Sequence, residues 1–161
     1  MPGWQQFGVN DFGGGFSNFI VENNFRTAAR TGSNNLRLFG NFFSPFEALG
    51  LFQDLPAAPG ETWAGSVFIQ NPTSDPAQGN FSEMHVEFRD AAGNFVGGQN
   101  FASTPQATGG TAQGQWIEFS AVAEAPPGTA TARFVILYFN VDFNGGSLLF
   151  DDASLLSLIH I

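Results

Sequence analysis

The hydrophobic residues of the chain fall into short segments in which apolar and polar positions alternate. The clearest case covers residues 82–90, where Met84, Val86 and Phe88 alternate with charged or polar neighbours. Successive side chains of a β-strand point to opposite faces, so this pattern predicts a strand with one buried face. Gly, Pro, Asn, Ser and Thr interrupt the apolar segments throughout, and helical spacing is almost absent. The pattern is typical of an all-β sandwich.

Turn residues such as those at 59–60, 91–94 and 126–128 separate about ten predicted strands of one antiparallel β-sandwich. We expect strands over residues 4–7, 16–21, 36–39, 50–55, 62–70, 82–90, 95–101, 115–123, 130–141 and 147–155. The apolar side chains of 130–141 run without alternation, so we expect both faces of this strand to be covered, or one face to meet a ligand. The length fits a single domain, residues 1–161.

The composition fits a globular chain, with 43% hydrophobic and 12% charged residues. The 20 Phe need a large core or an exposed aromatic patch, and such a patch favours a homo-oligomer. A net charge of -9 without any Lys argues against nucleic acid or an anionic membrane as partner. Without Cys there is no disulfide and no thiolate zinc site. No apolar run predicts a transmembrane helix, and a secretion signal would lie outside this sequence.

Residue types that could act in catalysis do not form a recognisable motif. The two histidines, His85 and His160, are far apart in the sequence, and no Gly-x-Ser-x-Gly segment accompanies them. Glu83 and Glu87 share a strand face but lie about 13 Å apart at ~3.3 Å per residue, which is too far for either glycosidase geometry. Residues 142–145 lack the spacing of a calcium loop and are interpreted as a turn. We therefore expect that the chain is not an enzyme.

The polar face of the 82–90 strand is the best candidate for a ligand-binding surface. His85, Glu87 and Arg89 lie on it, opposite the apolar face. Sugars have CH-rich faces that stack on aromatic rings and hydroxyls that pair with planar polar side chains, so a sheet face with both kinds of group suits carbohydrate. The alternatives are that Glu87 and Arg89 form a solvated pair and that His85 is an ordinary surface histidine.

Side chains of other strands would join this face if those strands pair with 82–90. Phe68 and Gln70 of segment 62–70 are candidates, and so are Tyr138 and Asn140 of segment 130–141. Tyr138 is the only Tyr among 20 Phe, so its hydroxyl suits a hydrogen bond to a ligand. The alternative for Tyr138 is burial in the core with one satisfied hydrogen bond.

Two adjacent acids, Asp151 and Asp152, stand in the predicted strand 147–155. Their side chains should face opposite sides of the sheet, so one of them should point toward apolar packing. A buried carboxylate is costly unless it is paired with a base or binds a cation. The nearest base in the sequence is Arg133, one strand away, which makes a bound ion a candidate. The alternative is a solvated acid at the end of a strand.

Four segments, in the same order along the chain, resemble segments of the jelly-roll carbohydrate-binding modules of families 4, 9, 16 and 22. Residues 29–38, Ala-Arg-Thr-Gly-Ser-Asn-Asn-Leu-Arg-Leu, resemble the early small-x-x-Gly-x-x-x-Leu-x-Leu strand. Residues 51–63 contain Gln-Asp-Leu and Pro-Gly-Glu-Thr-Trp, similar to the family's Gln-x-Leu and Pro-Gly-x-x-Tyr pair. Residues 114–129 contain Gly-Gln-Trp-Ile-Glu-Phe and Pro-Pro-Gly, and residues 148–155 end in Phe-Asp-Asp-Ala-Ser-Leu, like the family's closing strand.

The resemblance implies a jelly-roll fold and a non-catalytic module that binds a polysaccharide or oligosaccharide, secreted or at the cell surface. It also implies a structural calcium ion held by Asp151 and by backbone carbonyls around residues 32–34. The family's opening Asn-x-Gly-Phe-Glu segment is absent before Gly3-Trp4, so we expect an N-terminally trimmed domain whose calcium site lacks one acid. The alternative function is a structural or adhesive extracellular β-sandwich without affinity for sugar.

Overall fold

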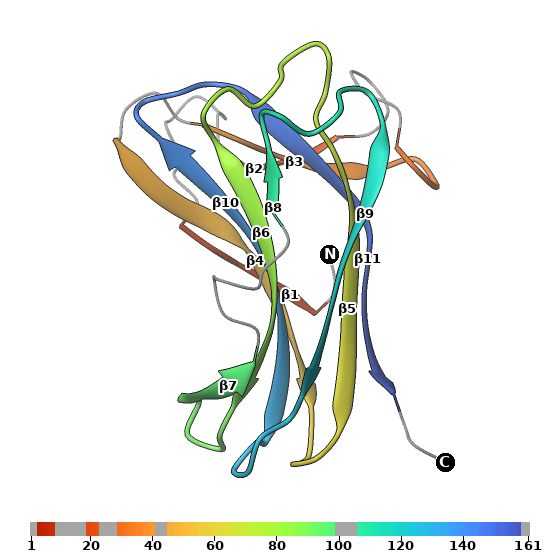
Figure 1. Cartoon of the computed structure of the whole chain (residues 1–161), viewed down its shortest axis with the longest axis vertical. Helices are drawn as coiled ribbons and strands as arrows, with labels where there is room; N and C mark the ends of the chain where they lie inside the picture. The colour runs from red at the N-terminus through yellow and green to blue at the C-terminus, as the bar shows by residue number, and fades with distance from the viewer. Residues whose placement is uncertain (1–2, 9–18, 23–28, 41–44, 99–105, 159–161) are drawn as a thin grey trace.

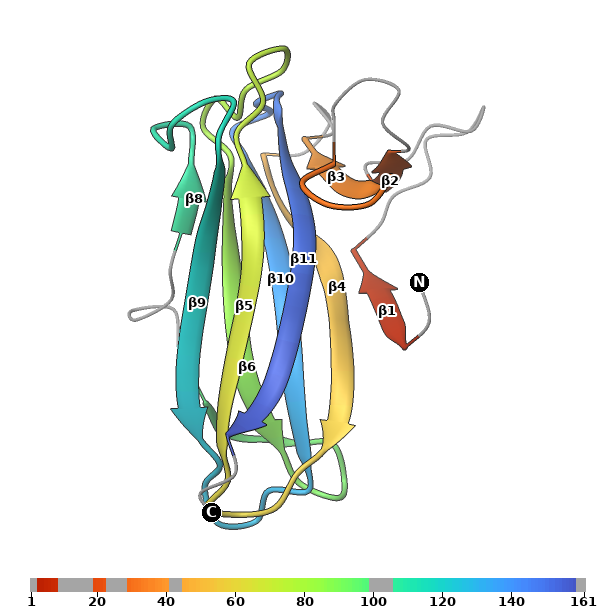
Figure 2. The ribbon, with the colours of Figure 1, turned by 90° about the vertical axis from the view of Figure 1, so that its right-hand side faces the viewer.

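The computed structural model describes residues 3–8, 19–22, 29–40, 45–98 and 106–158, which form two β-sheets packed face to face (Figure 1). Figure 2 shows the second sheet in front of the first, with the long strands of both running along the length of the molecule. The strands are β1 (Trp4–Phe7), β2 (Phe19–Glu22), β3 (Asn35–Phe39), β4 (Phe46–Pro56), β5 (Thr62–Gln70), β6 (Phe81–Arg89), β7 (Phe95–Gly98), β8 (Gln106–Thr108), β9 (Trp116–Glu124), β10 (Thr131–Val141) and β11 (Ser147–Leu158). The described residues contain no helix long and apolar enough to cross a membrane.

The two sheets are built from strands that are mostly distant in sequence. The first has the order β1-β4-β10-β6-β7, with β8 also paired to β6, and the second has the order β2-β3-β11-β5-β9. Every pairing between these strands is antiparallel. The predicted fold class, an antiparallel β-sandwich of the jelly-roll type, is confirmed.

Three strands differ from their predicted ranges because of their pairing partners. β4 begins at Phe46, earlier than expected, because its first residues pair with the end of β10. β8 replaces part of an expected loop, and its Thr108 pairs with Phe81 of β6. β11 extends to Leu158, which pairs with Thr62 of β5. The first two additions depend on partners that are remote in sequence, whereas the apolar residues after 155 already favoured an extension of the last strand.

The core lies between the sheets, where the alternating strands direct their apolar side chains. Met84, Val86 and Phe88 of β6 are fully buried there, as the alternation predicts. Val67 of β5 and Leu148 of β11 are fully buried in the same core, contributed by the second sheet. Side chains of one face of each sheet therefore fill the interior, and the other face of each sheet is turned outward.

Both faces of β10 are covered, which explains why its apolar residues do not alternate with polar ones. Phe134 and Ile136 belong to the core, at 0% and 1% exposure. Val135 and Phe139 point outward, yet they are only 5% and 7% exposed. β10 lies between β4 and β6, and Phe46 of β4 and Phe81 of β6 contact the ring of Phe139 on its outer face. Both faces of β10 therefore meet other side chains, and on the outer face Val135 and Leu137 also line a hollow.

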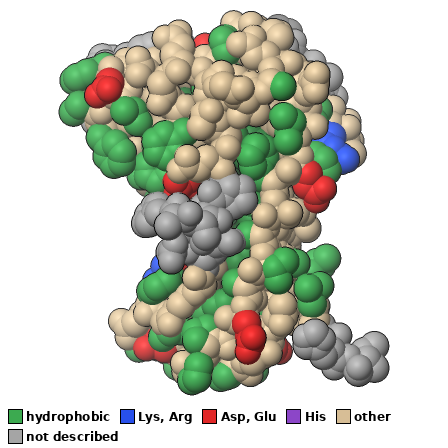
Figure 3. Space-filling model, in the orientation of Figure 1, with side chains coloured by type: hydrophobic (Ala, Val, Ile, Leu, Met, Phe, Trp, Pro, Cys, Tyr) green, Lys and Arg blue, Asp and Glu red, His purple; other side chains and the backbone are tan. Residues whose placement is uncertain are grey.

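Some large apolar side chains remain at the surface of the described residues. Phe46 is 59% exposed and leans on Phe139, with 5.8 Å between ring centroids, and Phe139 stacks on Phe81 at 4.7 Å. Leu156 and Val122 are 60% and 58% exposed on the second sheet. Figure 3 shows hydrophobic side chains gathered in several groups on one face of the molecule. Phe46 is thus an exposed ring in contact with the buried Phe139, and the expected exposed aromatic patch stays a prediction.

Candidate functional site

The outer face of the first sheet gathers charged and aromatic side chains from β1, β4, β6 and β10. The register places Glu87 of β6 opposite Arg133 of β10, and Arg133 opposite Asp54 of β4. In the adjacent row, Val135 of β10 lies between His85 of β6 and Phe52 of β4. These rows line a hollow of about 350 Å³. In Figure 1, β6 and β10 bend along their length, and this face lies on the inner side of the bend.

Two Phe rings form the aromatic side of the hollow. Phe7 of β1 and Phe52 of β4 have their ring centroids 6.3 Å apart, and both side chains are half-buried. Gly50 pairs with Phe7 and leaves room for its ring, since an added Cβ would lie 3.1 Å from that ring and 2.0 Å from the carbonyl oxygen of Ile136. The rings therefore lie close to the sheet and keep part of their surface open to the hollow.

Arg133 is held between the aromatic and the acidic groups of this face. Its guanidinium carbon lies 3.8 Å from the centroid of the Phe52 ring, in a cation–π arrangement. Its Nε and Nη2 donate to the two carboxylate oxygens of Asp54, at 2.7 and 2.8 Å. The hydrogen bonds to Asp54 raise the pKa of Arg133 above its ordinary value. A bidentate pair fixes the guanidinium plane, so Arg133 presents a rigid polar edge to the hollow.

A line of polar side chains runs along β6 on the same face. His85 lies between two acids, with its Nε2 3.0 Å from Oε2 of Glu83 and its Nδ1 3.4 Å from Oε1 of Glu87. Glu87 also accepts a hydrogen bond from Nη2 of Arg89 at 2.8 Å, and Glu83 accepts one from Nε2 of Gln106 at 2.5 Å. Side chains two positions apart on a strand point the same way, which allows these four residues of β6 to join end to end.

The pKa values of this line follow from its contacts. Burial opposes protonation of His85, but the hydrogen bonds to Glu87 and Glu83 outweigh it, so the pKa of His85 is raised. Burial alone would raise the pKa of Glu87, but the hydrogen bonds from His85 and Arg89 lower it overall. With His85 protonated, the charges of the face balance. The acids are Asp54, Glu83 and Glu87, and the bases are His85, Arg89 and Arg133.

This arrangement suits an uncharged ligand that has both apolar and hydroxylated surfaces, such as a sugar. The open parts of the Phe7 and Phe52 rings can contact CH groups. Glu87 and the two arginines can accept and donate hydrogen bonds, because a carboxylate has about four acceptor positions and a guanidinium five donors. Because the acids and bases of this face are paired, it gives no strong preference for an anionic or a cationic ligand.

Three of the predicted site residues, His85, Glu87 and Arg89, come together at this hollow. Glu87 and Arg89 are partly exposed, and their side chains keep 16% and 25% of their surface open. His85 differs from expectation, because it is only 3% exposed. It is therefore neither a surface histidine nor a side chain with much surface to offer a ligand, and its ring is occupied by two carboxylates.

The other three predicted site residues do not share this face, and that part of the prediction is wrong. Phe68 and Gln70 belong to β5, which pairs with β9 and β11 in the second sheet and not with β6. Tyr138 is 0% exposed and faces the core, where its hydroxyl donates to the carbonyl of Gly146 at 2.7 Å. Burial raises the pKa of Tyr138 far above its ordinary value. The buried alternative considered for Tyr138 is the correct one.

The hollow also includes residues that the sequence analysis did not single out. These are Phe7, Phe52 and Arg133, with Asp54 behind Arg133. Alternation within β10 could have identified Arg133. It stands an odd number of positions from Phe134 and Tyr138, so its side chain points to the face opposite to theirs. Phe7 and Phe52 stand on strands whose pairing only the fold reveals.

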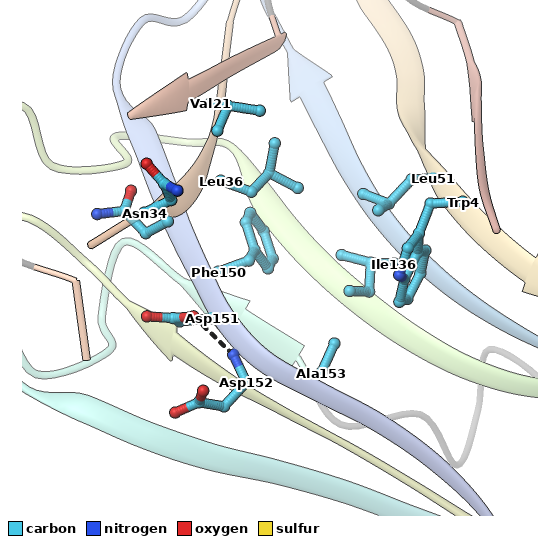
Figure 4. A pocket seen from close by; sticks show the side chains of 11 residues that line it. Trp4, Val21, Asn34, Leu36, Leu51, Ile136, Phe150, Asp151, Asp152 and Ala153 are labelled. Carbon is cyan, nitrogen blue, oxygen red and sulfur yellow. Dashed lines mark hydrogen bonds between the residues drawn. The ribbon is translucent and has the colours of Figure 1, made fainter. Parts of the chain in front are cut away.

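A second hollow, of about 240 Å³, opens between the two sheets near β1 and β3 (Figure 4). Leu51 and Ile136 of the first sheet line one side of it, and Leu36 and Phe150 of the second sheet line the other. The adjacent acids Asp151 and Asp152 also line it.

Both acids of β11 bind the same segment of chain, although simple alternation places them on opposite faces. β11 has a bulge after Asp151, and Asp152 has a φ of 49°, which turns the backbone. Oδ2 of Asp151 accepts the backbone N–H groups of Arg30 and Thr31, at 2.8 and 3.3 Å, and Oδ1 accepts that of Asp152 at 2.8 Å. The base beside these acids is Arg30, which is remote in sequence, whereas Arg133, the nearest base in the sequence, is bound to Asp54.

Asp152 completes this attachment through side chains. Its carboxylate accepts hydrogen bonds from Oγ1 of Thr31 and Nη1 of Arg30, each at 2.5 Å, and these bonds lower the pKa of Asp152. The guanidinium carbon of Arg30 also lies 3.4 Å from the ring centroid of Phe68. The contacts tie the segment before β3 to the outer side of the second sheet.

The described surroundings of Asp151 do not fit a calcium ion. Calcium binds six to eight oxygen ligands, whereas the oxygens of Asp151 face three N–H donors and the neighbouring charge is the cationic Arg30. Within the described ranges, no three His, Asp or Glu side chains lie close enough to hold a metal ion. The calcium ion expected at Asp151 stays an untested prediction.

Comparison with known proteins gives structural matches only. No protein-family model and no curated protein sequence matches the chain. The enzymatically active domain of bacteriophage CBA120 tailspike protein 4 matches with a TM-score of 0.62 and 14% identity, over 98% of this chain and 20% of that one. The CBM22-1–GH10 modules of Clostridium thermocellum xylanase 10B, complexed with xylohexaose, match with a TM-score of 0.61 and 16% identity. This match covers 97% of this chain and 26% of that one.

The CBM22-1 xylan-binding domain of Paenibacillus barcinonensis Xyn10C is a match that covers most of both chains. The TM-score is 0.60 and the identity 16%, over 99% of this chain and 88% of that domain. This chain thus spans about a fifth and a quarter of the first two matched structures and nearly the whole of the third. At these identities the matches establish the fold: the chain has the β-sandwich fold of carbohydrate-binding modules.

Proposed function

We propose that the chain is a non-catalytic module that binds an uncharged polysaccharide or oligosaccharide in the hollow on the outer face of the first sheet. The observation that carries this proposal is the combination, in one hollow, of the open rings of Phe7 and Phe52 with the fixed polar groups of Glu87, Arg89 and Arg133. Aromatic faces with a few oriented polar groups are the usual means of holding a small polar ligand. The shared fold with modules that bind xylan supports the same class of ligand.

The acids of the hollow support binding without hydrolysis. Glycosidases place two carboxyl groups on either side of the bond they cleave. The described side chains that line the hollow include one acid, Glu87, and its two oxygens already face His85 and Arg89. The tailspike structure that shares the fold is an enzymatically active domain, but this chain spans only 20% of it. We therefore assign binding, and not cleavage, to this module.

We further infer a location outside the cell or at its surface. Insoluble and long-chain polysaccharides are found there, and a module that binds them has to reach them. The formal net charge of -9 disfavours association with anionic polymers and does not hinder binding to neutral glycans.

The test is retention on immobilised neutral polysaccharides, including xylan and β-1,4-galactan, with two matched Phe→Ala variants. Phe52→Ala removes one ring of the hollow, and Phe68→Ala removes a half-buried ring from the outer face of the opposite sheet. We expect wild type and Phe68→Ala to be retained and Phe52→Ala to lose most of its retention, with thermal unfolding measured for each. Equal retention of the two variants, or no retention of the wild type on any neutral glycan, contradicts the proposal.

A further inference from the structure

The line Glu83–His85–Glu87–Arg89 has a geometry that depends on the charge of its histidine. Both ring nitrogens of His85 face carboxylate oxygens, Nε2 toward Glu83 at 3.0 Å and Nδ1 toward Glu87 at 3.4 Å. A neutral imidazole has one N–H and can donate to only one of two carboxylates, whereas the imidazolium donates to both. The imidazolium is therefore the form of the ring that can donate to both ionised carboxylates at once.

His85 lines the hollow but offers little open surface for direct contact with a ligand. Its side chain is 4% exposed and that of Glu83 3%, while Glu87 and Arg89 keep 16% and 25% of their surface open. Glu87 receives His85 on one oxygen and Arg89 on the other. His85 itself has little surface in the hollow, so Glu87 and, through it, Arg89 are its main connection to a ligand there.

We propose that His85 is a positioning residue, which in its imidazolium form holds the Glu87 carboxylate and the attached Arg89 guanidinium in the orientation that binds carbohydrate. This proposal rests on the proposed function of the hollow. When the ring is neutral, one of the two carboxylates loses its donor and faces a lone pair instead. The contact to Glu87, at 3.4 Å, is the longer of the two and is the one expected to be lost, which leaves Glu87 with the hydrogen bond from Arg89 as its restraint and loosens the pair that faces the ligand.

The charged groups around His85 favour the imidazolium from several strands. On β6 these are Glu83, Glu87 and Arg89, and β10 contributes Arg133, opposite Glu87. On β4, Asp54 neutralises Arg133, and β8 contributes the uncharged Gln106, which donates to Glu83. The two acids in direct contact with the ring thus act on it more strongly than the bases behind them.

The direction of the pH effect follows from these contacts. Hydrogen bonds to Glu87 and Glu83 raise the pKa of His85 above its ordinary value of 6.5, against the effect of burial. If the binding orientation needs the imidazolium, the apparent affinity scales with the fraction of the ligand-free protein in which His85 is protonated, and this fraction falls as the pH rises through the pKa of His85. Carbohydrate affinity should therefore be constant in mildly acidic solution and fall as the pH rises through the pKa of His85.

The test combines two measurements on the full chain. The affinity for the retained glycan is measured by calorimetry between pH 5 and 9, and the protonation of His85 is followed by NMR of the imidazole nitrogens in the ligand-free protein. We expect the affinity to fall by about tenfold, with a midpoint equal to the pKa found by NMR, as expected for one weakened hydrogen bond to a charged group. His85→Gln should bind weakly with a flat profile, and His160→Gln, the matched control, should keep the wild-type step.

Two outcomes overturn the inference while leaving the proposed function intact. One is affinity that stays constant across the pH range in which NMR shows His85 to titrate. The other is a spectrum of neutral His85 at pH 6 in a protein that binds glycan. The NMR measurement uses the wild type, so it decides the matter even if His85→Gln does not fold. Absence of binding at every pH refutes the proposed function itself, and with it this inference.

Discussion

Replacement of Tyr138 by Phe tests whether this residue belongs to the core or to the binding site. Tyr138 is 0% exposed, and its hydroxyl donates to the carbonyl of Gly146 at 2.7 Å. The loss of one buried hydrogen bond costs about 0.5–1.5 kcal/mol when its partner keeps another bond, and up to ~3 kcal/mol when the partner is left unsatisfied. The Gly146 carbonyl also accepts the N–H of Gly40 at 3.2 Å, so we expect the smaller cost.

A loss of about 1 kcal/mol lowers the melting temperature of a domain of this size by ~2–4 °C. Thermal and urea unfolding of wild type and Tyr138→Phe measure this, and glycan retention is measured in parallel. We expect lower stability with unchanged retention, because the hydroxyl points away from the hollow. Unchanged stability together with weaker retention would refute the assignment of Tyr138 to the core. A loss well above 3 kcal/mol would refute the view that Gly40 keeps the carbonyl satisfied.

Three other predictions concern different parts of the molecule. Gly50→Ala should lower the free energy of unfolding, measured in urea, by at least ~2 kcal/mol, because the added Cβ would lie 2.0 Å from the carbonyl oxygen of Ile136. A variant as stable as the wild type would contradict this close approach. Calcium binding at Asp151 is tested by the melting temperature in millimolar calcium and in EDTA. Because three N–H donors surround Asp151, we expect no difference between the two conditions. A higher melting temperature in calcium that Asp151→Ala abolishes would contradict this and show that calcium binds there. Self-association through exposed apolar side chains should raise the light-scattering mass with concentration, and Phe46→Ser should reduce the effect; a strict monomer at high concentration would exclude it.

Local patterns predicted the elements well where burial alone decides the sequence. The alternation of β6 correctly separated Met84, Val86 and Phe88 from the polar line of His85, Glu87 and Arg89. The same alternation rule, applied to β10, places Tyr138 on the core face with Phe134 and Ile136. The rule was hard to apply to this strand because apolar residues occupy both of its faces. The pattern of a single strand thus shows which side chains share a face, but not which of its faces is open.

What the sequence analysis missed depends on pairings between distant strands. Phe68 could be placed beside His85 only by assuming that β5 pairs with β6, whereas these strands belong to different sheets. Phe7 meets Phe52 because β1 pairs with β4 across Gly50. Arg30 reaches Asp152 because a bulge turns β11. Such contacts join residues that are tens of positions apart, and no local signal encodes them.

The most direct test of the account is an NMR titration with soluble fragments of the glycan that the module retains. Backbone amide signals are assigned, and the shifts caused by the oligosaccharide are mapped on the two sheets. We predict that the largest shifts fall on residues 50–54 of β4, 85–89 of β6 and 133–137 of β10, around the hollow. Shifts concentrated on β5, β9 and β11 instead would place the ligand on the second sheet and contradict the account.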